Sequence, residues 1–503
     1  MQTVKLDPSN IKGFECKLAT YIEAQDDSMD DCVIVKETIH LNDDTAVPNI
    51  RFLENFKRDL YVTKPGLRKH EHKKDFESLK NVQRYECTQR MLGPTVARIL
   101  KIPNSHDFRI MARSNYLYGA DVGVSEIIKH KYQTKYPDLY SLNRVAVLDL
   151  EHDVEYGTTQ ITSGSLTYKD RALLVVNRFF VQGFHCTEED IRKEFTNLLG
   201  EYEEKRKIKL YIEFVDHEWE VPVALMRYAH EWSPDIIAIW NMSYDIPKML
   251  AALAKGGIDP ATVFSHPQCP PKYQYAKWTE GSSVKVTASG RTFPLSPAER
   301  WHRFVCSAGF KFLDAMCVYQ KIRIAGGKVP GGYGLDNILH RHLGIRKLKF
   351  KEADHLEGLK WHEFMQSRFK IQYLIYNLFD CISVELLDEM NMDLCNKINL
   401  FSGVSNLDKF SSQPRRTCDA LHFFALQEEH VIGTTSDKMK VPELDDLVVG
   451  VDNWIVTLPS HMVADNGLRC IKEFPELSTL LFLHVADQPL CLLSCSIPPR
   501  RMR

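Results

Sequence analysis

Two acidic residues at the end of an apolar run are the first feature of this 503-residue sequence that could do chemistry. The segment RVAVLDLEHDV (144–154) is typical of a β-strand and carries Asp149 and Glu151 near its end. Residues two apart on a strand project from the same face. Carboxylates suit Mg²⁺ or Mn²⁺, and two such ions can promote phosphodiester cleavage. The alternative is that Asp149 and Glu151 are simply two solvated acids at the end of a strand.

A third carboxylate follows a second apolar run, PDIIAIWN (234–241). Asp245, in the segment Asn241-Met-Ser-Tyr-Asp245, is expected near the start of a helix, at the edge of the same sheet. The alternative is a helix N-cap, which Ser243 or Asp245 could provide, and the segment taken alone favours that cap.

A tyrosine and an aspartate share one face of a long helix expected over 361–392. Tyr376 and Asp380 are four residues apart, so the hydroxyl could orient a water beside a carboxylate-bound metal. The alternative is that Tyr373, Tyr376 and Phe379 are core aromatics and Asp380 faces solvent.

The elements that must position these side chains alternate along the chain. Strands are expected at 144–154, 172–184, 209–216 and 234–241, and helices at 86–100, 187–206 and 221–231. The segment 331–344 is expected to be a glycine-rich turn that leads into a helix ending at Gly344. A Pro-, Lys-, Ser- and Gly-rich stretch at 269–297 predicts a surface loop or insertion. The alternation predicts a mixed α/β sheet.

Composition excludes several classes of protein. Lys and Arg number 64 against 66 acids, so the chain lacks the overall basic charge of many nucleic-acid binders. A local basic segment, Lys57–Lys74, is either a nucleic-acid surface or a solvated helix face or loop. The 13 cysteines include no C-x-x-C pair and the start has no apolar signal, which predicts a cytoplasmic protein without disulfides. The apolar stretch 477–495 is interrupted by polar residues, so no membrane span is expected.

In their order, the three acidic segments resemble the exonuclease motifs of the proofreading domain of DNA polymerases, the DEDDy group with a ribonuclease H-like fold. The segment YGLDNILHRHLGIRKLKF (333–350) also resembles the stretch before the third motif in family B polymerases of the T-even phage type. The resemblance implies an α/β fold and hydrolysis of the 3′-terminal phosphodiester of DNA.

The resemblance also implies roles for individual residues. Its four metal ligands, which would hold two Mg²⁺ or Mn²⁺ ions, are Asp149, Glu151, Asp245 and Asp380. Tyr376 would orient the attacking water, Lys347 would contact the scissile phosphate, and Asn241 and Tyr244 would hold the unpaired 3′ end. The sequence departs from the family pattern at two points. His152 stands where many members have Thr, and the spacing from Asn241 to Asp245 is one residue shorter than in the T-even enzymes.

Beyond the exonuclease motifs the resemblance is weaker. Residues 1–140 are expected to form an α+β domain, which resembles the N-terminal domain of family B polymerases. The resemblance further implies an exonuclease domain at 141–400, an incomplete polymerase palm region at 401–487 and an unrelated tail at 488–503. The segment TLLFLHVAD (479–487) has the form of the first polymerase motif, a strand ending in Asp, and the match stops there. Neither a Tyr-x-Asp-Thr-Asp-Ser motif nor a Lys-x-x-x-Asn-Ser-x-Tyr-Gly helix occurs in the sequence.

The partners expected are therefore the single-stranded 3′ end of a primer and a second polypeptide that carries the polymerase half. The expected compartment is the cytoplasm, or the host cytoplasm for a viral protein. Two other classes stay open: a catalytically silent scaffold that binds primer-template DNA, and a structural ribonuclease H-like module in a protein assembly. Metal-dependent shortening of a DNA strand would separate the enzyme from both.

Overall fold

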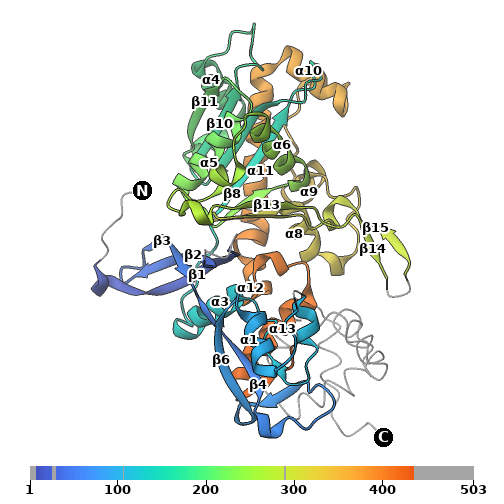
Figure 1. Ribbon diagram of the computed structural model, residues 1–503. Helices are drawn as coiled ribbons and strands as arrows, with labels where there is room; N and C mark the ends of the chain where they lie inside the picture. The colour runs from blue at the N-terminus through green and yellow to red at the C-terminus, as the bar shows by residue number, and fades with distance from the viewer. Residues whose placement is uncertain (1–6, 25–29, 106, 288–289, 435–503) are drawn as a thin grey trace, which may run out of the picture.

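The computed structural model describes residues 7–24, 30–105, 107–287 and 290–434 of the chain. It has a body built on a six-stranded sheet and, below it in Figure 1, a smaller unit that contains the N-terminal strands. The fold is of the mixed α/β class, as the alternation of strand and helix patterns predicts.

The six-stranded sheet provides the frame for the acidic residues. Its strands, in spatial order, are β11 (Lys209–Val215), β10 (Arg171–Asn177), β9 (Ile161–Tyr168), β8 (Val145–His152), β12 (Ile236–Ile239) and β17 (Lys311–Asp314). β9 runs antiparallel to both of its neighbours, whereas β8, β12 and β17 are parallel to one another, as are β10 and β11. The carboxyl ends of β8 and β12 therefore meet at one edge.

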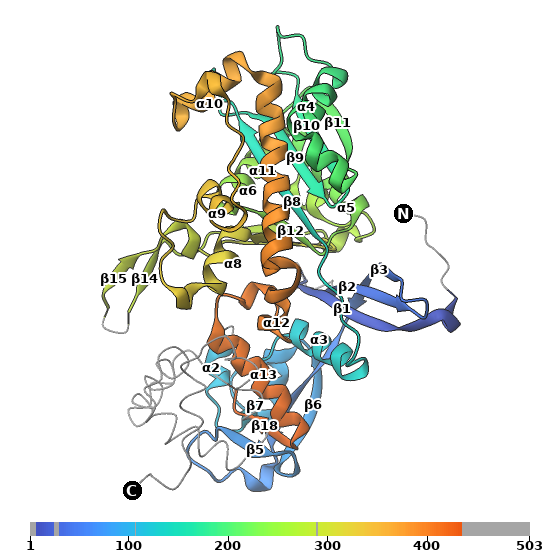
Figure 2. The ribbon, with the colours of Figure 1, turned by 180° about the vertical axis from the view of Figure 1, so that it is seen from behind.

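Helices flank this sheet. They include α4 (Glu188–Arg206), α5 (Glu220–Trp232), α6 (Met242–Lys255), α8 (Ala315–Ile322), α9 (Leu335–Leu343), α10 (Leu359–Arg368) and α11 (Lys370–Asn391). Thr187 and Asp190 form a capping box that fixes the start of α4, and Gly344, at φ 69°, ends α9 in the left-handed region as expected. Figure 2 shows α11 running along β8 and β9.

The alternation of side chains along β8 decides which face carries the acids. Ala146, Leu148 and Leu150 pack in a core with residues of α5 and α6. Val147 lies on the other face, in a core with residues of α11. Asp149 and Glu151 share the phase of Val147, so they face α11.

Four sequence-based boundaries are wrong in detail. The strand expected over 172–184 ends at Asn177, and turns follow it. The helix expected over 361–392 is two helices, α10 and α11, because Phe369 leaves helical geometry at φ −131°. The helix expected over 86–100 begins as a strand, β6 (Val82–Thr88), and becomes α1 only at Leu92–Leu100. The loop expected over 269–297 contains the strands β13 (Ala276–Thr279), β14 (Val284–Val286) and β15 (Thr292–Pro294). β14 and β15 form a hairpin that projects from the body (Figure 1).

The smaller unit combines distant parts of the sequence. It contains a sheet of β1 (Ile11–Ile22), β2 (Cys32–Leu41) and β3 (Ala46–Glu54), a sheet of β6, β4 (Lys57–Thr63) and β7 (Leu117–Tyr118), and the helices α2 (Phe108–Ala112) and α3 (Val124–Lys135). The chain returns to it late, where β18 (His430–Ile432) pairs with β5 (Phe76–Ser78) after α13 (Gln413–Gln427).

Much of the positive charge of the segment Lys57–Lys74 is engaged within the chain. Arg58 is buried and donates to the carbonyl of Gly119 at 3.0 Å. Lys73 donates to the carbonyls of Ala112 and Thr434, and Lys74 pairs with Glu77. These contacts tie the unit together and leave less of the segment available for nucleic acid than its composition suggests.

The expected strand at 479–487, the apolar stretch at 477–495 and the tail at 488–503 lie outside the described residues. The described part of the 401–487 region, up to Thr434, contains α13 and β18. The domain boundaries remain predictions. Of the helices in the described ranges, none has the length and apolar character needed to cross a membrane.

Candidate metal centre

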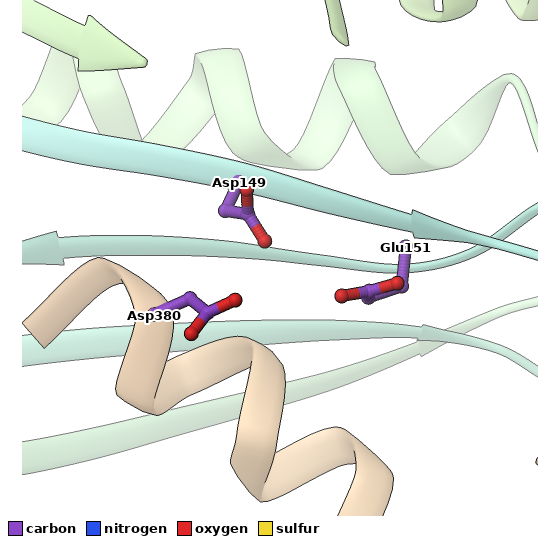
Figure 3. A group of neighbouring side chains, drawn as sticks. All are labelled: Asp149, Glu151 and Asp380. Atoms are coloured by element: carbon purple, nitrogen blue, oxygen red, sulfur yellow. The ribbon is translucent and has the colours of Figure 1, made fainter. Parts of the chain in front are cut away.

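Three carboxylates meet between β8 and α11. Asp149 and Glu151 come from β8 and Asp380 from α11, and one oxygen from each lies within 4.8 Å of the others. Figure 3 shows the three side chains directed into the same space between strand and helix. The arrangement could hold a metal ion.

The neighbouring turn of α11 fixes one of these ligands. Asn377 is fully buried and donates from Nδ2 to Oδ2 of Asp149 at 2.7 Å. Its own Oδ1 accepts a hydrogen bond from the hydroxyl of Ser165 on β9 at 2.6 Å. Sequence analysis missed Asn377, although its position three residues before Asp380 places it on the same helical face.

Asp245 lies outside this group of three carboxylates and contacts the backbone of β8 between Asp149 and Glu151. β12 ends at Ile239, so the N–H of Leu150 has no strand partner there, and Oδ1 of Asp245 accepts from it at 3.2 Å. Asp245 does not cap α6, so the cap favoured for the isolated segment is wrong. The N-cap position is Asn241, whose side chain makes no capping bond.

The start of α6 is held by a residue that the sequence did not single out. Asp314, at the end of β17, is buried and accepts from the backbone N–H of Met242 at 3.0 Å and of Cys317 at 2.8 Å. It therefore joins the first turns of α6 and α8. Burial raises the pKa of Asp314 to about 7.

Burial raises the pKa of all four acids, and repulsion within the group adds to it for Asp149, Glu151 and Asp245. Burial followed by the charge of Asp380 raises the pKa of Asp149 to about 7. Burial followed by the charge of Asp149 raises the pKa of Glu151 to about 8. Burial also raises the pKa of Asp245 well above its usual range, with Asp149 adding to it. The positive charge near these carboxylates is therefore too small to offset the effects of burial and repulsion on their pKa values.

Lys347 supplies one positive charge. Its Nζ lies 2.5 Å from Oδ2 of Asp380 and 3.0 Å from the hydroxyl of Tyr376. Burial lowers the pKa of Lys347, but the ion pair with Asp380 outweighs it and the pKa is raised. Asp380 itself is 4% exposed, so the alternative in which it faces solvent is wrong.

A divalent cation fits this set of donors. Oδ1 of Asp380 is buried and has no hydrogen-bond partner within the described part of the chain. Buried acceptors without a donor are rare unless an ion or water is bound. The donors are all carboxylate oxygens, which bind hard cations such as Mg²⁺ and Mn²⁺ in preference to softer metals.

Tyr376 lies beside this cluster within a group of aromatic rings. Its ring centroid is 4.9 Å from that of Trp361 and 5.9 Å from that of Tyr373, and Lys347 lies over its ring. Burial raises the pKa of Tyr376, so its hydroxyl stays protonated at neutral pH. Tyr373, Tyr376 and Phe379 are buried, as the alternative interpretation of this segment had them, but Asp380 does not face solvent.

The residues expected to hold a 3′ end lie at the start of α6. Tyr244 is half-buried, and its hydroxyl lies 2.7 Å from Nε2 of His152. Lys248 lies over the Tyr244 ring at 5.8 Å. Asn241 is exposed, and its Oδ1 accepts from the hydroxyl of Ser243 at 2.7 Å.

No protein-family model matches the chain, and no curated protein matches it.

Proposed function

We propose that this chain is a metal-dependent 3′→5′ exonuclease of the DEDDy proofreading type, acting on the 3′ end of DNA. The observation that carries the proposal is the convergence of Asp149, Glu151 and Asp380 within 4.8 Å. Asp245 adjoins them through the backbone of Leu150. Two of the three acidic segments thus supply one buried cluster of carboxylates, and the third places Asp245 beside it.

The architecture of the sheet supports the same proposal. One antiparallel strand, β9, lies between two strands of the opposite direction, and parallel strands β12 and β17 follow β8 on the other side. We take this mixed sheet, with Asp149 and Glu151 near the carboxyl end of β8, to be the ribonuclease H-like fold that the resemblance implies. In open α/β sheets, ligands commonly bind beyond the carboxyl ends of the strands.

Asp149, Glu151, Asp245 and Asp380 would hold two Mg²⁺ or Mn²⁺ ions. Bound there, such ions would stabilise the charge on the attacking and leaving oxygens. Tyr376 would orient the attacking water through its hydroxyl, which its raised pKa keeps protonated, so it acts as a hydrogen-bonding group and not as a base. Lys347, already 3.0 Å from that hydroxyl, would pair with the scissile phosphate.

The remaining residues would bind the strand end. Tyr244 offers an aromatic face at the rim, and stacking on a base is tolerant of sequence and contributes about 1–3 kcal/mol per base. That tolerance suits an enzyme that removes any mispaired nucleotide. Asn241, exposed at the first turn of α6, would contact the terminal sugar or base.

We also propose, from the resemblance to family B polymerases, a second polypeptide that carries the polymerase motifs. Co-expression with a candidate polymerase half, followed by a primer-extension assay of the purified pair, would test it. Absence of both association and extension would count against the partnership without affecting the exonuclease proposal.

The exonuclease proposal is tested with matched charge variants. The full chain is incubated with a 5′-labelled single strand and Mg²⁺, alongside Asp149→Asn plus Glu151→Gln. The control is Glu188→Gln plus Glu189→Gln, two exposed acids in the first turn of α4. We expect the wild type and the control to shorten the strand and the site variant to lose nearly all activity. Binding without shortening by the wild type would favour the scaffold class.

A further inference from the structure

We propose that helix α10 is a positioning element for the acidic site, acting through two side chains one turn apart, His362 and Gln366. The proposal deepens the proposed function and rests on it for its readout in DNA cleavage. Neither residue belongs to the three motifs. Each reaches the end of β8, where Glu151 lies, by a different route.

His362 reaches the carboxylate of Glu151 through one tyrosine. Nδ1 of His362 lies 2.8 Å from the hydroxyl of Tyr373, and that hydroxyl donates to Oε2 of Glu151. A hydroxyl has one proton to donate, so with Glu151 ionised the Tyr373 oxygen accepts from Nδ1–H of His362. The three groups then form a directed chain of hydrogen bonds that holds one rotamer of Glu151.

Gln366 reaches the backbone that follows Glu151. It is fully buried, and Nε2 donates to the carbonyl of His152 at 2.7 Å. Its Oε1 accepts from the N–H of Val154 at 2.9 Å and of Glu155 at 3.3 Å. The pairing of β8 with β9 shifts register between Glu151 and His152, so the regular ladder is interrupted at this point. Gln366 satisfies the backbone groups that the strand leaves unpaired.

The break before α11 sets the direction of α10. Because Phe369 interrupts the helix, α10 takes its own course, and residues four apart on it face β8 together. Met365 is fully buried and anchors the helix in the core. Trp361 packs against Tyr376 with ring centroids 4.9 Å apart, so the same helix also braces the proposed water-orienting residue.

A positioning role has a measurable signature. Groups that orient a metal ligand change metal affinity, typically by about 10–100-fold, more than they change contacts with the rest of the substrate. Removal of His362 or Gln366 should therefore raise the metal concentration needed for activity. The KM for DNA should change little, and high metal concentration should restore most of the rate.

The test compares full-length variants of one helix. His362→Leu and Gln366→Met remove the hydrogen bonds, His362→Asn keeps a donor near the position of Nδ1, and Glu363→Ala, an exposed residue of α10, is the control. Free Mn²⁺ is measured by electron paramagnetic resonance without DNA, and the Mg²⁺ requirement is measured in DNA cleavage. We expect His362→Leu and Gln366→Met to weaken Mn²⁺ binding about 10-fold or more, and His362→Asn to recover most of it.

Wild-type Mn²⁺ affinity in folded His362→Leu and Gln366→Met would overturn the inference. Tyr373→Phe, which deletes one hydroxyl and keeps the ring, covers the case in which those variants fail to fold, and its unchanged Mn²⁺ affinity would overturn the inference equally. A wild type that binds Mn²⁺ without shortening DNA would reject the exonuclease proposal. The Mn²⁺ measurement would still decide the role of α10.

Discussion

At the scale of residues, the site concentrates more negative charge than the chain neutralises. Lys347 pairs with Asp380, while Asp149, Glu151 and Asp245 keep raised pKa values because of burial and their mutual repulsion. Such an arrangement is costly for the metal-free protein and favourable for a protein that binds divalent cations.

The first prediction is that Asp149→Asn stabilises the protein while inactivating it. The amide removes one buried charge and can still accept from Asn377, so in EDTA at pH 8 the melting temperature should rise by about 1–3 °C. DNA cleavage should fall by about 100-fold or more. Lys347→Ala is the contrasting variant, since it leaves Asp380 unpaired and should lower the melting temperature. Calorimetry of both variants in EDTA measures the two changes. Melting temperatures that shift in the same direction in both variants would contradict the charge argument.

A second prediction concerns pH. The pKa of Asp149 rises from 3.8 to about 7 and that of Glu151 from 4.5 to about 8, so between pH 4 and 8 the folded protein binds more protons than the unfolded chain. The free energy of unfolding of the metal-free protein should therefore fall as pH rises through this range. Mg²⁺ should stabilise the fold more at pH 8.5 than at pH 5.5. Melting temperatures with EDTA and with Mg²⁺ at both pH values test this, and a pH-independent effect of Mg²⁺ would contradict it.

At the scale of elements, apolar strands could be predicted and a polar strand could not. β8 and β12 follow from β-branched apolar runs, and the acids at the end of β8 follow from the period of two. β9 was missed because its sequence, ITSGSLTY, is rich in Ser, Thr and Gly, although every residue of it is buried. Its neighbours on both sides and the helices on both faces supply the burial that its composition does not indicate.

The turn between α10 and α11 was missed for a similar reason. The sequence around Phe369 has no Gly or Pro to signal a break, so its apolar pattern predicts one continuous helix. As a result the contributions of His362 and Gln366 could not be predicted. Their hydrogen bonds depend on tertiary placement of α10 and not on local spacing.

Gly164 on β9 gives a prediction at this scale. A Cβ atom there would lie 2.8 Å from Leu225 and 2.9 Å from both Leu150 and Val221, in the core below the acids. Gly164→Ala should lower the free energy of unfolding by about 1–3 kcal/mol through overpacking. Gly200→Ala, inside α4 with 3.9 Å of space, should raise it by about 0.5–1 kcal/mol. Denaturant titration measures both, and destabilisation by Gly200→Ala alone would contradict the packing argument.

At the scale of the whole molecule, the smaller unit is closed by a late segment of the chain. β18 pairs with β5, and Val431 is fully buried in a cluster with Tyr61, Val82 and Tyr118. The sequence could not predict this pairing, because three-residue strands more than 350 residues apart carry no local signal for it.

Val431→Asp tests whether that unit can be disturbed separately from the acidic site. A buried unpaired charge should destabilise the unit by about 3 kcal/mol or more. Hydrogen exchange should become faster in β4 and β6, while amides of β8 and the affinity for Mn²⁺ remain close to wild type. Equal loss of protection in β8 would show that the unit and the body unfold together.

The most direct test of the exonuclease proposal is the direction of cleavage. The full chain is incubated with Mg²⁺ and a 5′-labelled single strand that ends either in a free 3′ hydroxyl or in an inverted 3′–3′ nucleotide. The account predicts a ladder of products shortened one nucleotide at a time from the free 3′ end, and an intact strand where that end is inverted. No cleavage with Mg²⁺ or Mn²⁺, or the same internal cuts in both strands, would contradict it.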